Sequence, residues 1–284
     1  METKPKIKKN FLHSQWKKIS LGVIVAVFIG GALLGARIFA FDPKGHPMDR
    51  SLFAFLFRDI KLSDSQKKQL QSMIDQNQGR MMAMQTARKN GLQELLKKDD
   101  LSASSIQSFL TNMSTLAEGN INEVIDGHFQ MVATLDKDQK QILENNLSQS
   151  MNRWEKRNSD LGKGKKDGDF SRRKEWISER LSLDSTQKAE LEKITQGMQS
   201  YLKSSSMADL RQNIFEKLKN PSTSAQDLKN IVSQHIKEMQ SRFPSLSQDL
   251  ANFYAKLNAK QKTDLKDWVN KRWEKMSQRH LMMD

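Results

Sequence analysis

A nine-residue phrase that occurs four times constrains this sequence more than any other feature. The copies are LSDSQKKQL (62–70), LDKDQKQIL (135–143), LDSTQKAEL (183–191) and LNAKQKTDL (257–265). Each has Leu first and last, a Ser, Asp or Asn second, and Gln three residues after that. The second residue is of a type that caps helix N-termini, and Gln at this spacing completes a capping box. The phrase therefore predicts four helix starts, with its first leucine just outside the helix and its last leucine two turns inside, on the core side.

The residues assigned this structural, helix-capping role share the same three positions of the phrase. They are Leu62, Ser63, Gln66, Leu135, Asp136, Gln139, Leu183, Asp184, Gln187, Leu257, Asn258 and Gln261.

The four copies form two pairs. From 62 to 135 is 73 residues, and from 183 to 257 is 74. The tails of the two halves agree as well, because NRWEKR at 152–157 matches KRWEKM at 271–276. Self-similarity at a fixed offset is the signature of an internal repeat, so the sequence predicts a tandem duplication of one helical unit.

The N-terminal region indicates the compartment. Six lysines among residues 1–20 precede LGVIVAVFIGGALLGARIFAF at 21–41, in which Arg37 is the only charge. Twenty-one helical residues span the roughly 30 Å hydrocarbon core of a bilayer, and a basic flank stays in the cytoplasm. We predict a basic cytoplasmic tail, a transmembrane or signal helix at 21–41, and an exported body. The long apolar run without a clean A-x-A triplet favours an uncleaved anchor over a cleaved signal peptide.

The net charge of +14 has two causes. Residues 1–41 hold seven Lys or Arg and one acid, so six of the fourteen net charges orient the membrane helix and eight remain on the body. No nucleic-acid motif occurs, and we expect no nucleic-acid partner. The absence of cysteine excludes disulfides and thiol chemistry, and the scarcity of glycine (13) and proline (5) favours an all-α fold.

Apolar periodicity predicts three helices in the first half. One long helix is expected from about 63 to 97, a second follows the break KKDDLSASS at 97–105, and a third begins at Asp136 and runs past Trp154. The second half is expected to repeat this pattern, with NPSTSAQ at 220–226 as its break.

A short apolar segment precedes the first phrase of each half. It is LFAFLF at 52–57 in the first half and EWISERL at 175–181 in the second. One interpretation is a short helix that packs under the long one. The other is an exposed adhesive patch for clients or for the partner half. Scattered surface aromatics rarely need a function, which favours packing.

Catalytic and metal motifs are scarce. No two of the five histidines stand three or four residues apart, and no nucleophile elbow or phosphate-binding glycine loop occurs. We therefore predict no enzyme activity, no catalytic residues and no cofactor. Among 15 methionines, Met282 and Met283 beside His280 are the candidates for a soft-metal site, while Met81 and Met84 fit helix packing.

Paired Leu-Thr-x-x-Gln motifs at this spacing resemble the LTxxQ-motif family, which contains Spy- and CpxP-like periplasmic proteins. Here the Thr position is taken by Ser63, Asp136, Asp184 and Asn258, all of which can cap a helix. The resemblance implies two tandem Spy-like long-helix hairpin domains, at 50–157 and 172–280, joined by a linker at 158–171.

The resemblance also implies a function. It predicts a periplasmic, ATP-independent chaperone-like protein that binds unfolded proteins under envelope stress and is anchored in the inner membrane through residues 21–41. The alternative is a membrane-anchored sensor of heavy metals or stress that regulates a signalling partner. Either a monomeric cradle built from both halves or a homodimer fits this family.

Overall fold

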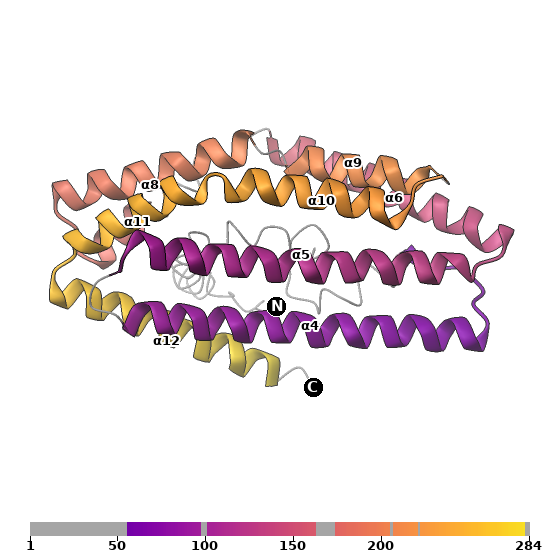
Figure 1. Cartoon of the computed structure of the whole chain (residues 1–284), viewed down its shortest axis with the longest axis horizontal. Helices are drawn as coiled ribbons and strands as arrows, with labels where there is room; N and C mark the ends of the chain where they lie inside the picture. The colour runs from indigo at the N-terminus through magenta and orange to yellow at the C-terminus, as the bar shows by residue number, and fades with distance from the viewer. Residues whose placement is uncertain (1–55, 98–100, 163–173, 205–206, 221, 282–284) are drawn as a thin grey trace, which may run out of the picture.

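The computed structural model describes residues 56–97, 101–162, 174–204, 207–220 and 222–281. These residues are helical, with short connections and no strand among them. The helices are α4 (Asp64–Lys97), α5 (Ala103–Ala133), α6 (Lys137–Gly162), α8 (Ser185–Ser204), α9 (Met207–Lys219), α10 (Ala225–Gln240), α11 (Phe243–Lys256) and α12 (Ala259–Leu281). Together they form an elongated stack of helices that run along a common long axis (Figure 1).

The first half follows the predicted pattern closely. Helices α4, α5 and α6 begin and end near the expected positions, because each start has its cap and each apolar stripe is continuous. One boundary differs. Helix α6 continues to Gly162, so the first residues of the predicted linker at 158–171 are helical. The remaining linker residues lie outside the described part of the chain.

One helix of the second half is divided. Helices α10 and α11 stand where the first half has the single helix α5, with a turn at 241–242 between them. Helices α8 and α9 stand where it has α4, and residues 205–206 between them lie outside the described part of the chain. Pro244 lies in the first turn of α11, where the missing proline N–H has no helical partner to lose.

The predicted anchor at 21–41 and the basic tail before it lie outside the described residues. Within the described ranges, no helix combines the length and the apolar character that a membrane span requires.

Helix α5 lies at the centre, between α4 on one side and the α10–α11 pair on the other (Figure 1). Two polar contacts fix its direction relative to α10. Lys229 Nζ lies 2.6 Å from Asp126 Oδ1, and Gln240 donates to Ser114 Oγ at 2.8 Å. As the residue number rises along α10 it falls along α5, so the two helices are antiparallel.

The hydrophobic core crosses the boundary between the predicted halves. Its larger cluster contains Leu110 on α5 together with Ile194 on α8 and Val232 on α10, all at most 1% exposed. The smaller cluster belongs to the first half, around Met131 and Leu147, but Phe215 and Leu218 of α9 pack against it. Burial of shared apolar surface therefore holds the two halves together.

The short apolar segments pack into these clusters. Leu56 and Phe57 are each 5% exposed within the smaller cluster, and Ile177 is 5% exposed within the larger one. Trp176 packs partly buried against the larger cluster. The packing interpretation is confirmed for these residues, whereas 52–55 lie outside the described part of the chain.

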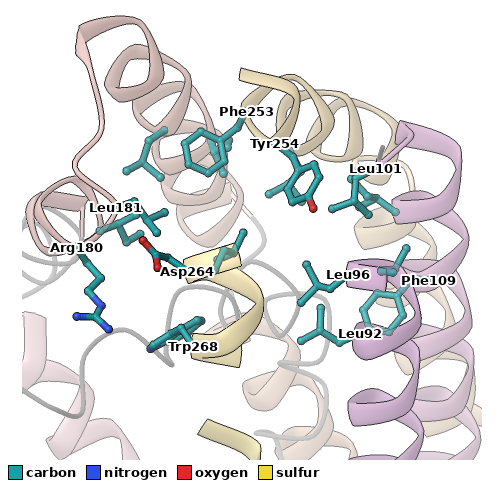
Figure 2. A pocket seen from close by; sticks show the side chains of 17 residues that line it. Leu92, Leu96, Leu101, Phe109, Arg180, Leu181, Phe253, Tyr254, Asp264 and Trp268 are labelled. Atoms are coloured by element: carbon teal, nitrogen blue, oxygen red, sulfur yellow. The ribbon is translucent and has the colours of Figure 1, made fainter. Parts of the chain in front are cut away.

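The larger cluster contains an apolar cavity of about 100 Å³ (Figure 2). Leucines and aromatic rings from both halves line it, among them Leu96 and Phe109 from the first half and Phe253 from the second. Arg180 and Asp264 are the charged residues of its lining. The cavity thus lies where the end of α4 and the start of α5 meet α8, α11 and α12.

Helix α5 packs tightly against α4 at Gly91. A Cβ atom added there would lie 2.6 Å from Phe109 Cε2, closer than van der Waals contact allows. A Cβ added at Gly79 or Gly119 on the same two helices would meet nothing within 4 Å. Glycine in mid-helix costs conformational entropy, so its presence at position 91 reflects the tight helix contact.

Gly91→Ala should therefore lower the free energy of unfolding by about 1–2 kcal/mol, because overpacking outweighs the better helix propensity of alanine. Gly79→Ala and Gly119→Ala are matched controls and should raise it by about 0.5–1 kcal/mol. Urea unfolding followed by circular dichroism measures all three. Equal stabilisation by all three changes would contradict the close approach.

Burial lowers the pKa of His128 on α5 to about 4. In the unfolded chain its pKa is about 6.5, so between these values the unfolded state binds a proton that the folded state does not. Stability should fall as the pH drops from about 6.5 towards 4, by up to about 3 kcal/mol. The free energy of unfolding should therefore differ less between pH 7.5 and pH 4.5 in His128→Phe than in the unchanged protein. An equal difference in both proteins would refute the lowered pKa of His128.

Candidate functional site

All four phrases form the predicted capping boxes. The Ser63 amide donates to Gln66 Oε1 at 2.9 Å, and the Gln66 amide donates to Ser63 Oγ at 3.2 Å. The same two bonds, at 2.8–3.0 Å, join the pairs Asp136–Gln139, Asp184–Gln187 and Asn258–Gln261. Each box satisfies two backbone donors at a helix N-terminus.

The structure also joins the phrases in pairs, which the sequence did not predict. In the first half, Gln66 Nε2 donates to Gln139 Oε1 at 3.0 Å, and Gln139 Nε2 donates back to Gln66 Oε1 at 3.1 Å. The second hydrogen of each amide goes to a backbone carbonyl, from Gln66 to Thr134 at 2.7 Å and from Gln139 to Lys61 at 2.8 Å. The starts of α4 and α6 are thereby bonded to each other.

The second half repeats the arrangement. Gln187 and Gln261 donate to each other's Oε1 at 2.8 and 2.9 Å. Gln187 also donates to the Lys256 carbonyl at 2.7 Å, and Gln261 donates to the Leu181 carbonyl at 3.0 Å. The starts of α8 and α12 are bonded in the same way as those of α4 and α6.

This pairing explains why the phrase carries Gln in all four copies. Glutamate serves equally well in a capping box, but an ionised carboxylate cannot donate a hydrogen bond. The four glutamine residues are between 4% and 9% exposed, so an unpaired acceptor at this depth would be costly. The sequence did contain a signal for this pairing, because the position is Gln in all four phrases and never Glu.

The closing leucines lie on the core side as predicted, and the leucines that precede the boxes are buried or partly buried as well. Leu135, Leu183 and Leu257, which precede three of the boxes, are 3–4% exposed. Leu62 is partly buried against the smaller cluster. The closing leucines divide into two buried ones, Leu143 and Leu191, and two partly buried ones, Leu70 and Leu265.

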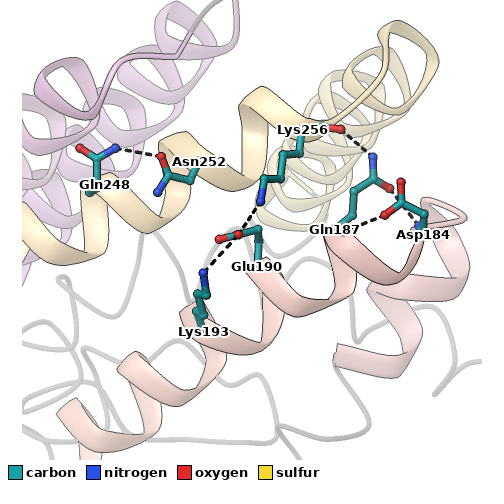
Figure 3. A network of polar contacts seen from close by, with 7 residues as sticks. All are labelled: Asp184, Gln187, Glu190, Lys193, Gln248, Asn252 and Lys256. Carbon is teal, nitrogen blue, oxygen red and sulfur yellow. Dashed lines mark hydrogen bonds and ion pairs between the residues drawn. The ribbon is translucent and has the colours of Figure 1, made fainter.

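In the second half an ion pair around the buried carboxylate of Glu190 extends from the glutamine pair. Lys256, whose carbonyl accepts from Gln187, places its Nζ 2.6 Å from Glu190 Oε1, and Lys193 Nζ lies 3.3 Å from the same oxygen (Figure 3). The Glu190 side chain is 8% exposed. The hydrogen bond from Lys256 lowers the pKa of Glu190 and outweighs the opposing effect of burial. Glu190 is therefore ionised at neutral pH and joins α8 to α11.

The side chains of the candidate metal ligands lie outside the described part of the structure. Within the described ranges, no group of three His, Asp or Glu side chains is arranged to hold a metal ion. His280 lies in α12, and Met282 and Met283 lie outside the described residues. Met84 is buried and Met81 packs against the larger cluster, as predicted for core methionines.

The arrangement of the paired phrases is structural, because its groups hold helix ends together by neutral hydrogen bonds. Gln261→Glu keeps the acceptor of the capping box but removes the donor to the Leu181 carbonyl and places a carboxylate against Gln187 Oε1. We expect it to lower the free energy of unfolding by about 2–4 kcal/mol at pH 7.

Part of that loss should be recovered near pH 4, where a protonated glutamate can donate again. Gln248→Glu is the matched control, since Gln248 is exposed on α11 and donates to the neighbouring Asn252. Urea unfolding of both variants at the two pH values gives the comparison. If Gln261→Glu were as stable as the control at pH 7, the reciprocal pair would contribute little to the free energy of unfolding.

Comparison with known proteins supports the assignment of the phrase. The family model described as LTXXQ motif family protein matches residues 50–147, which include both phrases of the first half. No curated protein and no solved structure matches the chain. Proteins of this family are associated with the periplasm and with chaperone or stress-related roles. Residues 50–147, with their paired phrases at the starts of α4 and α6, match the LTXXQ motif family, as the resemblance predicted.

Proposed function

We propose that this protein is an exported, ATP-independent chaperone that holds unfolded or partly folded polypeptides under envelope stress. The observation that carries the proposal is the reciprocal glutamine pair within the family-matched segment 50–147, because it links the family's motif to a defined helix arrangement. The anchor proposed at 21–41 would keep the body at the outer face of the inner membrane.

We further propose that the chain is a tandem duplication whose two halves form one cradle. The support is a set of equivalent contacts. Helix α6 packs against α9, and α12 packs against α4, so each half lays its last helix on the other half's first. Such reciprocal contacts are those of a two-fold interface, here within one chain. A monomer would then contain what a single-unit relative assembles as a homodimer.

Apolar side chains outside the core supply a surface for clients. Met82 on α4 and Leu116 on α5 are 59% and 44% exposed. Methionine adapts its shape to different partners, and flexible apolar surfaces of this kind suit promiscuous binding. The eight net positive charges beyond residue 41 would hasten capture of acidic chains.

The test is suppression of aggregation by the full-length chain, measured by light scattering of a chemically unfolded client diluted into buffer without ATP. We expect slower aggregation at equimolar chaperone. The double change Met82→Ser and Leu116→Ser should weaken client affinity roughly fivefold, which corresponds to about 1 kcal/mol of lost apolar contact.

The control carries Ala83→Ser and Thr115→Ser, two exposed neighbours on the same helices. Its activity should equal that of the unchanged protein. Failure to slow aggregation of any client, together with micromolar metal binding that requires His280, Met282 and Met283, would favour the sensor alternative. An obligate dimer in solution would count against a cradle built within one chain.

A further inference from the structure

We propose that the cavity between the two halves binds one apolar side chain, of the size of Phe or Leu, from a polypeptide with an acidic residue beside it. The inference rests on the proposed holding of unfolded polypeptides and names a site for it. The cavity is separate from the exposed Met82 and Leu116, which do not line it.

The size of the cavity determines the kind of occupant. Its volume of about 100 Å³ and its lining of Leu, Ile and aromatic side chains resemble those of apolar cavities that stay dry and accept a benzene-sized molecule. A single benzyl or isobutyl group fits such a space. A long acyl chain would leave most of its methylene groups in water, where they gain nothing from burial. The volume therefore favours a side chain over a lipid chain.

The cavity reaches the surface at its charged edge. Arg180, which lines it, is exposed, and Asp264 and Trp268 are half-buried (Figure 2). A side chain can therefore enter beside Arg180 while the polypeptide backbone stays outside. The edge is formed by residues 174–181 and α12, and the floor by α4 and α5 of the other half.

The two charged residues of the lining differ in their partners. Asp264 is paired with Lys260, with 2.7 Å between the oxygen and the nitrogen. Arg180 has no ion-pair partner within the described part of the chain. Its guanidinium would pair with a carboxylate next to the buried side chain of a client. A lysine in that place would be repelled.

Fluorescence anisotropy of the full chain with dye-labelled heptapeptides tests the proposal. One peptide has Glu-Phe-Glu at its centre, the second replaces Phe by Ala, and the third replaces both Glu by Lys. We expect the first to bind at least about tenfold tighter than either of the others at low ionic strength, where surface charges are least screened.

Two variants separate the contribution of the Arg180 charge from that of the apolar cavity. Arg180→Gln should abolish the preference for Glu over Lys and leave the preference for Phe over Ala. Lys188→Gln, an exposed cation on α8 outside the cavity lining, is the control and should change neither. Leu250→Trp should fill the cavity and abolish the preference for Phe. An unchanged or raised unfolding temperature would show that this variant is folded.

Three results would overturn the proposal: equal binding of the Phe and Ala peptides, equal effects of Arg180→Gln and Lys188→Gln, or Arg180-dependent binding of decanoate that exceeds that of the peptide. The aggregation assay, run on the same Leu250→Trp protein, distinguishes failure of this binding site from failure of the proposed chaperone function. A chain that suppresses aggregation but shows no peptide preference retains the proposed function and loses this site. A chain that prefers the Phe peptide but suppresses nothing does the reverse.

Discussion

The reciprocal glutamine pair is the interaction on which the helix arrangement depends. Each glutamine caps its own helix and bonds to the amide of the other, so that two helix starts separated by more than seventy residues are fixed side by side. Helix α5, which lies between the first two phrases, must then run back along α4. One buried hydrogen-bonded pair thus sets the hairpin geometry, while apolar burial supplies most of the free energy.

The two pairs lie at opposite ends of the molecule, since α5 runs antiparallel to α10 and α11 (Figure 1). A polar network therefore holds the helix starts of each half together at one end of the molecule. Along the middle, the apolar surfaces of the two halves pack against each other. The common core of Leu110, Ile194 and Val232 fills that middle. Polar contacts specify each half and apolar contacts join the halves, which agrees with the directional character of hydrogen bonds and the non-directional character of burial.

The sequence predicted what depends on neighbours along the chain. Capping chemistry placed the starts of α4 and α6, and helical periodicity placed Met84 in the core. It did not predict contacts between distant segments, such as the glutamine pairs or the packing of α5 against α11, because side-chain periodicity shows which face is buried and not what covers it. The helical extension to Gly162 was missed because a charged, glycine-containing stretch resembles a linker.

The two ends of the molecule differ in chemistry despite their similar frames. Glu190 is the eighth residue of its phrase and Lys256 directly precedes another, whereas the equivalent positions in the first half are Gln69 and Thr134, which cannot form an ion pair. At the first half's end, Phe215 of α9 packs against the smaller cluster, while the second half's end contains the cavity. An empty volume of this size costs roughly 2 kcal/mol, so the two ends differ in packing as well as in charge.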